Sequence, residues 1–522
     1  MPKLRRLFQP TLTDLLGLLL LVLVIVTGSR RLFGDADVAT HVATGRWILD
    51  HRSVPTTDPF PGPFQGHEWF AHEWLTDLLM GAIHAAAGWP GIVWLSALLI
   101  AAAHVILYRH LLRRGDDAVA AFGATMAAAS TASMHWLARP HLVTVLFLVI
   151  WTAVLEGVTR GALPPRRLFL LPPLALLWAN LHGGFLMALV ILGCYGAGVV
   201  IQMALSRGSR REPVRPPGLA SWTIVTLLTA GAVLINPWGY RLPLHEIAYI
   251  ALHGEAIAHT AEFESPSLLD RAGVATAGFL VLCLAGLALG LVAARRAQRR
   301  GGPHWTTRFH PGTLLAFLVT TAMALRSIRH VELMVIFGAI LLADGVSIGI
   351  AQKAPRDLQA LLEPWRRRER RAGGGWFLAG LLIAALLAVS GRFPESGFDA
   401  SLFPVKQVRA LRETGVRPRG PVFTPDVWGG YLLLEWPEAP ILVDGRWDMR
   451  GDAFYLRYVG TLGAGPGWAT NLAEDRVDWV LVPPEAPLAR ALHASPEWDF
   501  RGGDATAEVF QRKPEAAGPD SR

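Results

Sequence analysis

The stretch "LFLLPPLALLWANLHGGFLMALVILGCYGAGVVIQMAL", residues 168–205, is almost entirely apolar and is interrupted only by "NLHGG" at 180–184. It is too long for a single ordinary membrane span, which needs about 20 residues. The paired glycines break helices readily and divide the stretch into candidate spans at 168–181 and 184–204. Whether it forms one span or two decides on which side of the membrane every later loop lies.

The rest of the chain has the composition of a polytopic membrane protein. Of its 522 residues, 52% are hydrophobic and 17% are charged, whereas soluble domains carry about 25% charged residues. The apolar runs lie at 12–28, 91–108, 117–134, 141–158, 168–181, 184–204, 221–236, 273–294, 312–325, 331–350 and 376–390. We therefore predict an α-helical polytopic membrane protein with about eleven transmembrane helices.

The positive charges favour two spans in the stretch 168–204. They cluster in the loops at Lys3, Arg5 and Arg6; Arg109, Arg113 and Arg114; Arg160, Arg166 and Arg167; Arg207, Arg210, Arg211 and Arg215; Arg295, Arg296, Arg299 and Arg300; and Lys353, Arg356, Arg366, Arg367, Arg368, Arg370 and Arg371. With eleven spans every cluster falls on one side, as the positive-inside rule requires. The pattern predicts a multi-pass protein of the cytoplasmic (inner) membrane, with a cytoplasmic N-terminus and an external, periplasmic C-terminal region.

Several function classes are disfavoured at this point. The formal net charge of +8 is explained by these topology-setting loops, and no nucleic-acid-binding motif accompanies it, so we expect no nucleic-acid partner. Cys194 and Cys283 lie inside apolar runs and are expected to pack as small hydrophobic residues. The N-terminal apolar run is followed by no A-x-A-like cleavage site, so we predict an uncleaved first span.

The external side of the predicted bundle gathers most of the unusual polar residues. They are Asp35, Asp37, His41, Asp58, His67, Glu68, His72, Glu73, Arg139, His141, Asn180, His182, Asn236, Glu262, Glu264, Arg326, Arg329 and His330. Ionisable groups at membrane depth are costly and are usually functional. Each of them alone could be an interfacial anchor or a helix cap, but the convergence of six segments on one face favours a site.

The segment "GHEWFAHEWLTD" at 66–77 resembles a zinc-protease box without meeting its geometry. His67 and His72 are five residues apart and therefore point about 140° apart on a helix, whereas H-E-x-x-H places both histidines on one face. The sequence also contains no G-x-S-x-G motif and no P-loop. His72 and Glu73 are expected to line the site, and His67 to lie on the surface.

A remaining chemistry that suits these residues is group transfer from a lipid-linked phosphate. A carboxylate of the first external loop can accept the proton of an acceptor hydroxyl. The leaving group is an ionised phosphate, which needs cationic hydrogen-bond donors. The candidate donors are Arg139, Arg326, Arg329 and His330.

The C-terminal region, 392–513, alternates short apolar runs with helical stretches near 404–415, 450–460 and 484–494. The apolar runs are "PVFTP", "GGYLLLEW", "APILVDG", "DWVLVPP" and "AEVFQRK". We predict a small external α/β domain here, after a membrane domain at 1–391 whose first external loop is 29–90, and before a disordered tail at 514–522. In "DGRWD", Asp444, Arg446 and Asp448 are either site residues or an Arg–Asp structural pair.

The order of motifs resembles the GT-C glycosyltransferase superfold, and more closely a group of bacterial multi-spanning proteins. The stretches that carry the resemblance are "DADVATHVATGRWILDHRSVPTTDPF", "WFAHEWLTDLL", "ARPHL", "WANLHGGF", "INPWGY", "EFESPS", "RSIRHVEL", "DVWGGYLLLEWP" and "ILVDGRWDMRGD". The resemblance implies a polyprenyl-phosphate-linked sugar donor and a catalytic base at Asp35 or Asp37. In that setting the residues expected to bind substrate are His41, His72, Glu73, Arg139, His182, Glu262, Arg326, Arg329 and His330.

The resemblance leaves the cofactor and the activity open. A divalent cation, Mg or Mn, is compatible with Asp35, Asp37 and Glu73, but the site could equally work without one. We expect a membrane glycosyltransferase of the bacterial cell envelope that acts on a glycan, lipid or protein acceptor at the external face of the bilayer. The alternatives are a lipid or glycan transporter, which usually shows internal repeats, and a non-catalytic envelope-glycan assembly protein.

Overall fold

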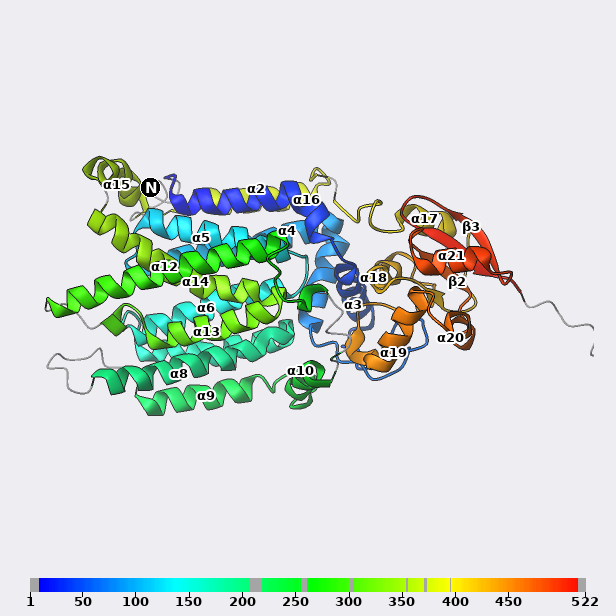
Figure 1. Cartoon of the computed structure of the whole chain (residues 1–522), viewed down its shortest axis with the longest axis horizontal. Coiled ribbons are helices and arrows are strands. Elements are labelled where there is room, and N and C mark those ends of the chain that lie inside the picture. Colours follow the sequence, from blue (N-terminus) through cyan, green and yellow to red (C-terminus); the bar gives the residue numbers. More distant parts are fainter. Residues whose placement is uncertain are drawn as a thin grey trace, which may run out of the picture.

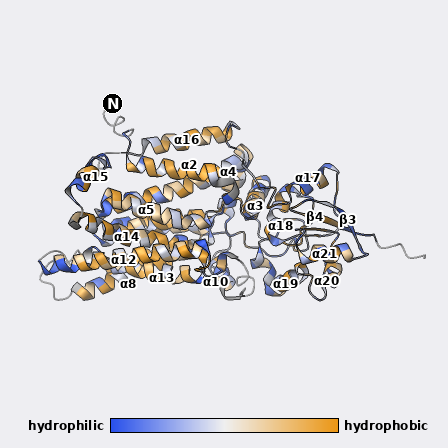
Figure 2. Ribbon diagram, turned by 45° about the horizontal axis from the view of Figure 1, so that its top comes forward, coloured by the Kyte–Doolittle hydropathy of each residue, from blue (hydrophilic) through white to orange (hydrophobic). Residues whose placement is uncertain are grey.

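The computed structural model describes residues 9–206, 218–252, 254, 261–300, 305–353, 355–369, 373–394 and 396–514. Residues 515–522 of the tail predicted at 514–522, and the basic residues at 1–8 and 207–217, lie outside this range. The molecule is elongated, with a helical bundle at one end and a part that combines helices and strands at the other (Figure 1). The bundle helices are mainly hydrophobic in side-chain character (Figure 2).

Every apolar run predicted as a membrane span forms a helix. The bundle helices are α2 (Leu12–Leu32), α4 (Trp74–Arg114), α5 (Ala118–Ala132), α6 (His141–Thr159), α7 (Leu171–Leu181), α8 (Leu186–Ser206), α9 (Leu219–Ala232), α12 (Arg271–Arg299), α13 (Pro311–Arg326), α14 (Val331–Lys353) and α16 (Gly375–Val389). Five helical stretches in the described residues are long and apolar enough to cross a membrane, namely Trp74–Arg114, His141–Thr159, Gly183–Leu205, Arg271–Arg299 and Ile328–Ala351. The number of eleven crossings stays a prediction.

The stretch 168–205 is divided where its sequence predicts. The helix α7 ends at Leu181, and His182 is extended, with φ −165° and ψ 142°. The backbone N–H of Gly184 donates to Nδ1 of His182 over 2.9 Å, which caps the short turn before α8. A side chain at Gly183 would place Cβ 2.7 Å from a carboxylate oxygen of Glu246, so the glycine allows close approach as well as the break.

The first external loop contains a helix, α3 (Asp37–His51), that was not predicted. The helix α3 packs directly on the start of α4, because a Cβ on Gly45 would lie 1.8 Å from the carbonyl oxygen of Asp77. The helix α4 is also longer than predicted, since it begins at Trp74 and continues through the span expected from residue 91. Gly88, with φ 59°, breaks its regular geometry before that span.

The C-terminal part contains a mixed four-stranded sheet. Its elements are α17 (Val405–Glu413), β1 (Val422–Phe423), α18 (Asp426–Glu435), α19 (Trp447–Leu462), α20 (Trp468–Glu474), β2 (Trp479–Val482), α21 (Pro487–Ala494), β3 (Trp498–Gly503) and β4 (Glu508–Arg512). The strand order is β1-β2-β4-β3, with β1 parallel to β2 and both other pairs antiparallel. The predicted helices and the strands at "PVFTP", "DWVLVPP" and "AEVFQRK" are confirmed.

Two of the predicted apolar runs are not strands. "GGYLLLEW" lies in the helix α18, and "APILVDG" contributes only a bridge between Ile441 and Val422. A short apolar run that is buried on all sides has the same hydrophobic pattern in a strand and in a helix, so the sequence does not distinguish the two. The helix also brings Gly430 against α3, where a Cβ would lie 2.4 Å from the carbonyl oxygen of Ala36.

Buried ion pairs join the C-terminal part to the first external loop. Arg446 donates from Nη1 to Oδ1 of Asp58 over 2.6 Å and from Nη2 to Oδ2 over 3.2 Å. Asp444 accepts from both Arg446 and Arg450. Burial raises the pKa of Asp444, but these two guanidinium groups outweigh it and hold the pKa well below its usual range. Asp444 and Arg446 are therefore the structural pair that the sequence left as one of two interpretations.

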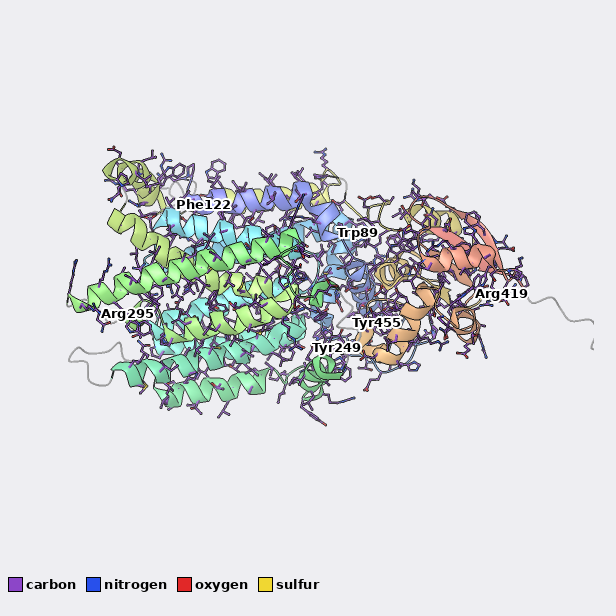
Figure 3. All side chains as sticks on the ribbon, viewed as in Figure 1. Trp89, Phe122, Tyr249, Arg295, Arg419 and Tyr455 are labelled. Atoms are coloured by element: carbon purple, nitrogen blue, oxygen red, sulfur yellow. The ribbon has the colours of Figure 1, made fainter. Side chains whose placement is uncertain are left out.

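The two ends of the bundle differ in charge and partners. Arg295 lies at the end remote from the C-terminal part, whereas Trp89 and Tyr249 lie at the end next to it (Figure 3). Arg160 donates to the backbone carbonyl oxygens of Arg114 and Arg308. Basic residues from three different loops therefore lie together at the remote end, which agrees with the one-sided distribution of positive charge predicted from the sequence.

The contact between α3 and α4 predicts that Gly45→Ala destabilises the protein. The added methyl group meets the backbone of Asp77, and overpacking of this kind costs about 1–3 kcal/mol. The thermal unfolding midpoint in detergent should fall. Gly123→Ala, in α5, is the matched control, because nothing lies within 4 Å of its Cβ position, and it should be neutral or slightly stabilising. Equal midpoints for the two variants would contradict the expected close packing.

Candidate functional site

The centre of the candidate site is Arg139, which faces three carboxylates from two segments. Its Nη1 lies 3.0 Å from Oε1 of Glu262 and 3.6 Å from Oδ2 of Asp35, and its Nη2 contacts Asp37. Burial raises the pKa of Glu262, but Arg139 and Arg329 outweigh it and hold the pKa well below its usual range. Asp35 differs, because burial raises its pKa above the usual value despite Arg139.

Local structure explains how these groups converge. Asp35 follows the end of α2, and its Oδ1 accepts the backbone N–H of Asp37 over 3.0 Å at the start of α3. Arg139 occupies the short connection between the 3-10 turn Ser133–His135 and α6. The C-terminal part completes the wall, because a Cβ on Gly445 would lie 2.4 Å from Oδ1 of Asp37. A side chain at Gly445 would displace the Asp37 carboxylate from this position.

A second group of charges continues from α3 to the start of α4. Nδ1 of His41 lies 2.8 Å from Oδ1 of Asp77, and its Nε2 lies 3.5 Å from Oε2 of Glu73. Burial lowers the pKa of His41, but Asp77 and Glu73 outweigh it and raise the pKa to about 9. His182 joins the group through Nε2, which lies 3.3 Å from Oε1 of Glu73.

The third group brings the C-terminal part into contact with the helix α10 (Arg241–Leu252). Nε2 of His245 lies 3.4 Å from Oδ2 of Asp448, and Nδ1 of His72 lies 3.7 Å from Oε1 of Glu246. Atoms of His72, His245 and Asp448 that can ligate a metal all lie within 4.8 Å of one another. Asp448 is therefore the charged residue of "DGRWD" that reaches the site, together with Gly445.

A further group of potential metal ligands is fully buried beside Arg139. It consists of His135, His141 and Glu332, again within 4.8 Å. Nε2 of His141 lies 3.6 Å from Oε2 of Glu332, and Nε2 of His135 lies 3.3 Å from Oε2 of Glu262. Burial lowers the pKa of His135, but these carboxylates outweigh it and raise the pKa to about 9. The protonated ring therefore neutralises part of the acidic charge.

Most of the predicted site residues lie in these groups. Asp35, Asp37, Arg139, Glu262, His41, Glu73, His182 and His72 form the contacts described above. Arg329 lies close by, with its guanidinium 4.9 Å from the ring centroid of Phe263, and His330 is half-buried next to it. Arg326 is exposed, and none of the side-chain ion pairs among the described residues includes it.

The predicted metal ligands do not form one set. Asp35 and Asp37 face Arg139, whereas Glu73 faces His41, His72 and His182. Among the described residues, the groups with metal-ligand spacing are the two histidine–carboxylate sets instead. The guanidinium of Arg139 occupies the position between carboxylates in which the sequence suggested a cation.

Several residues of the site were not singled out from the sequence. They are Asp77, His135, His245, Glu246 and Glu332. Asp77 follows Glu73 by four residues and could have been found from helical spacing. His245 and Glu246 carry no such signal, because only the fold of the chain brings α10 to the first external loop.

Superposition on solved structures identifies the fold of this chain. No protein-family model matches the chain, and no curated protein matches it in sequence. The oligosaccharyltransferase AglB from Archaeoglobus fulgidus, in complex with an inhibitory peptide and a dolichol-phosphate, superposes with a TM-score of 0.58 and 12% identity over 96% of this chain and 74% of its own. The oligosaccharyltransferase of that organism in complex with Zn and sulfate superposes with a TM-score of 0.53 and 12% identity over 91% and 68%.

ArnT from Cupriavidus metallidurans bound to undecaprenyl phosphate superposes with a TM-score of 0.52 and 14% identity over 97% of this chain and 99% of its own. AglB and ArnT are GT-C fold membrane glycosyltransferases. The chain therefore has the GT-C fold, and the resemblance predicted from its motifs is confirmed at the level of the fold.

The raised pKa of His41 predicts a pH dependence of stability. The pKa is about 6.5 in an unfolded chain and about 9 in the fold, so the charged ring stabilises the fold fully below about pH 6.5. This stabilisation is lost as the pH rises through 9. His41→Gln should lower the unfolding midpoint at pH 6.5 and reduce its fall between pH 6.5 and 9.5. His67→Gln, at an exposed position, is the control, and an equal change in both variants would contradict the assignment.

Proposed function

We propose that this protein is a GT-C-type membrane glycosyltransferase, which moves a sugar from a polyprenyl-phosphate-linked donor to an acceptor at the external face of the bilayer. The observation that carries the proposal is the convergence of Asp35, Asp37 and Glu262 on Arg139, next to Arg329, in a chain with the GT-C fold. The presence of dolichol-phosphate and undecaprenyl phosphate in the AglB and ArnT structures supports the class of donor.

Asp35 is the proposed base. The carboxylate is held 3.6 Å from Arg139, which fixes its orientation, while burial raises its pKa and so increases its affinity for a proton. The acceptor hydroxyl oxygen attacks the anomeric carbon of the donor, and its proton passes to Asp35. The bond between that carbon and the phosphate oxygen breaks, and the phosphate leaves with the electron pair. Asp37 is more restrained, because it contacts Arg139 on one side and Gly445 on the other.

Arg329 is the proposed partner of the leaving phosphate. Arg139 already contacts three carboxylates, so it serves mainly to position them. Arg329 stacks on Phe263, and no carboxylate within ion-pair distance of it is found among the described residues. An arginine without an ion-pair partner offers five N–H donors to the phosphate oxygens on which negative charge develops as the sugar is transferred.

The membrane arrangement follows from the same proposal. Eleven crossings with the basic loops in the cytoplasm leave the site and residues 392–513 on the external side of a bacterial cytoplasmic membrane. The C-terminal residues then act as an external domain whose "DGRWD" segment borders the acceptor side of Asp37. A glycan, lipid or protein of the cell envelope is the expected acceptor, and access through the bilayer edge suits a polyprenyl chain.

A divalent metal ion is proposed at His72, His245 and Asp448. Two imidazoles and a carboxylate suit zinc better than the Mg or Mn suggested by the sequence. The side-chain oxygen Oδ2 of Asp448 is buried and makes no hydrogen bond within the described part of the chain, which leaves it available as a ligand. Glu246 and Glu73 lie beside His72 and add negative charge that favours a cation. A bound ion would supply positive charge for the phosphate of the donor.

The central test is transfer by the purified protein from labelled polyprenyl-phosphate sugars to membrane extract. Asp35→Asn should lower the rate about 10²–10⁴-fold, because the base is lost. Arg329→Gln should also lower the rate, because the leaving phosphate loses its cationic partner. Asp50→Asn, an exposed carboxylate on α3, is the matched control. Full activity in Asp35→Asn would contradict the assignment. Binding of a lipid-linked sugar without transfer to any acceptor would favour the non-catalytic assembly protein instead.

Metal content can be measured separately from activity. The purified protein, dialysed against zinc and then against buffer, should retain about one zinc per chain by elemental analysis. His245→Ala and Asp448→Asn should retain less, whereas His67→Ala, outside the group, should match the unaltered protein. Undiminished zinc in Asp448→Asn would exclude this set of ligands.

A further inference from the structure

The end of the bundle remote from the candidate site contains a cavity of about 850 Å³. It lies between the C-terminal end of α4, the turn into α5, the C-terminal part of α14 and the helix α15 (Arg356–Glu369). The polar groups used below are Arg109, Arg113, Arg308, Asp116, Asp117 and Glu369. Leu112, Ile348 and Ile350 give the same cavity an apolar side.

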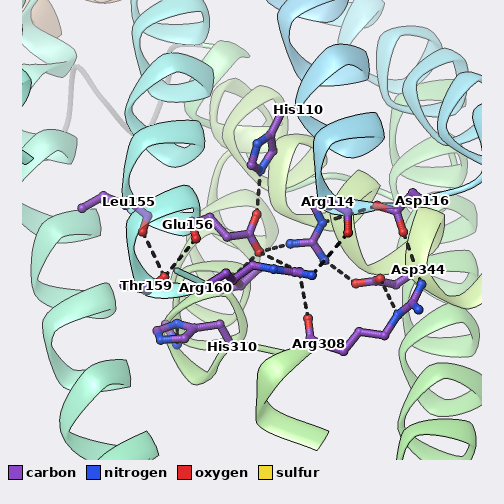
Figure 4. Close-up of polar contacts among 12 residues, drawn as sticks. His110, Arg114, Asp116, Leu155, Glu156, Thr159, Arg160, Arg308, His310 and Asp344 are labelled. Atoms are coloured by element: carbon purple, nitrogen blue, oxygen red, sulfur yellow. Dashed lines mark hydrogen bonds and ion pairs between the residues drawn. The ribbon is translucent and has the colours of Figure 1, made fainter. Parts of the chain in front are cut away.

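A buried ion network forms one wall of the cavity (Figure 4). Arg114 contacts both Glu156 and Asp344, and Arg308 donates from Nε to Oδ1 of Asp344 over 2.8 Å. Arg308 also lies 3.4 Å from Asp116. The network joins α4, α6 and α14 and fixes the position of Arg308, whose side chain is 35% exposed to the cavity side.

The carboxylates of the cavity already have partners, including Glu363, whose Oε1 accepts from Nε of Arg367 over 2.9 Å. Asp117 lies 2.5 Å from Nε of Arg366 and accepts the N–H of Val119 over 3.0 Å. Glu369 accepts the N–H of Leu12 over 2.8 Å and the hydroxyl of Thr13 over 2.5 Å. These oxygens therefore have little remaining capacity to bind a cation.

The arginines retain unused donors. Arg109 reaches Glu369 and Thr13 only over 3.5 and 3.3 Å, through a single Nη atom. Arg113 is exposed, and the described residues include no ion-pair partner for it. Since each guanidinium has five N–H groups, the cavity offers a surplus of donors. Its ligand is expected to be an anion with several acceptor oxygens.

The helix α15 indicates that this anion belongs to a lipid. One of its faces carries Leu358, Leu361 and Trp365, which are 41%, 68% and 40% exposed, while Arg366 points inward to Asp117. A helix with an exposed apolar face and a basic face lies in the membrane interface. We therefore expect the apolar face of α15 to lie against the acyl chains beside the cavity.

We propose that this cavity binds the phosphate head group of one anionic phospholipid from the leaflet that faces the basic loops. Arg109, Arg113 and Arg308 hold the phosphate oxygens, and the acyl chains lie along Ile348, Ile350 and the apolar face of α15. Basic pockets between helices on the cytoplasmic side are known to bind such head groups. The proposal is independent of glycosyl transfer, because none of these residues belongs to the candidate site.

Lipid retention tests the proposal on the full-length protein. Protein from nanodiscs that contain phosphatidylglycerol and phosphatidylcholine is examined by native mass spectrometry in detergent. The unaltered protein should retain one phosphatidylglycerol in preference to phosphatidylcholine. The double variant Arg109→Gln/Arg113→Gln should weaken retention by about five-fold for each arginine removed. Arg113→Gln alone is the second variant, because its side chain makes no contact needed for folding among the described residues.

Arg295→Gln/Arg296→Gln is the matched control, since it removes two exposed positive charges from the same end of the bundle but outside the cavity. It should retain the lipid like the unaltered protein. An equal loss in the control, or no loss in the cavity variants, would overturn the proposal. Displacement of the lipid by millimolar inorganic phosphate would also overturn it, because the cavity would then be a site for the free ion.

Discussion

The buried pair between Arg446 and Asp58 is the contact on which the composition of the candidate site depends. The guanidinium is held by two bonds to Asp58 and lies 5.0 Å and 4.9 Å from the ring centroids of Phe60 and Trp69. Two residues further along the chain, Asp448 meets His245, and one residue earlier Gly445 meets Asp37. Removing one partner of a buried pair leaves an uncompensated charge, at a cost of about 3–5 kcal/mol. The first external loop and the C-terminal part therefore form a single wall, although they are nearly 400 residues apart in sequence.

In the site, cationic and carboxylate side chains lie next to one another, and neither kind is gathered in one place. Arg139 lies among Asp35, Asp37 and Glu262, and His41 lies between Asp77 and Glu73. At Glu262 burial is outweighed by the neighbouring cations, which lower the pKa of the carboxyl, whereas at Glu73 burial prevails and raises the pKa. Burial raises the pKa of Asp35 in the same way, and Asp35 differs from Glu73 in lying beside Arg139, where a carboxylate with a raised pKa is suited to accept a proton.

Sequence patterns predicted the bundle better than the site. Apolar length and the "NLHGG" break located the helices, since both depend on residues that are close in the chain. Asp35, Arg139 and Glu262 could be proposed because each is an ionisable residue of a predicted external loop. His245 and Glu332 could not, because their partners are distant in sequence. The helix at "GGYLLLEW" was misread as a strand, because its burial on every side removes the periodicity that distinguishes the two.

The network around Arg114 has a consequence for how the protein is made. Glu156 and Asp344 follow Arg114 by 42 and 230 residues, so the chain is synthesised with the cation first and its two partners later. Arg114 is the last residue of α4 and its side chain is buried, so its charge is uncompensated until those partners are in place. The helix α6 can pair with α4 soon after it emerges, whereas α14 supplies the last carboxylate when most of the bundle already exists. The ion network is therefore completed only when α14 is in place, and a chain truncated before residue 344 leaves Arg114 and Arg308 without that carboxylate.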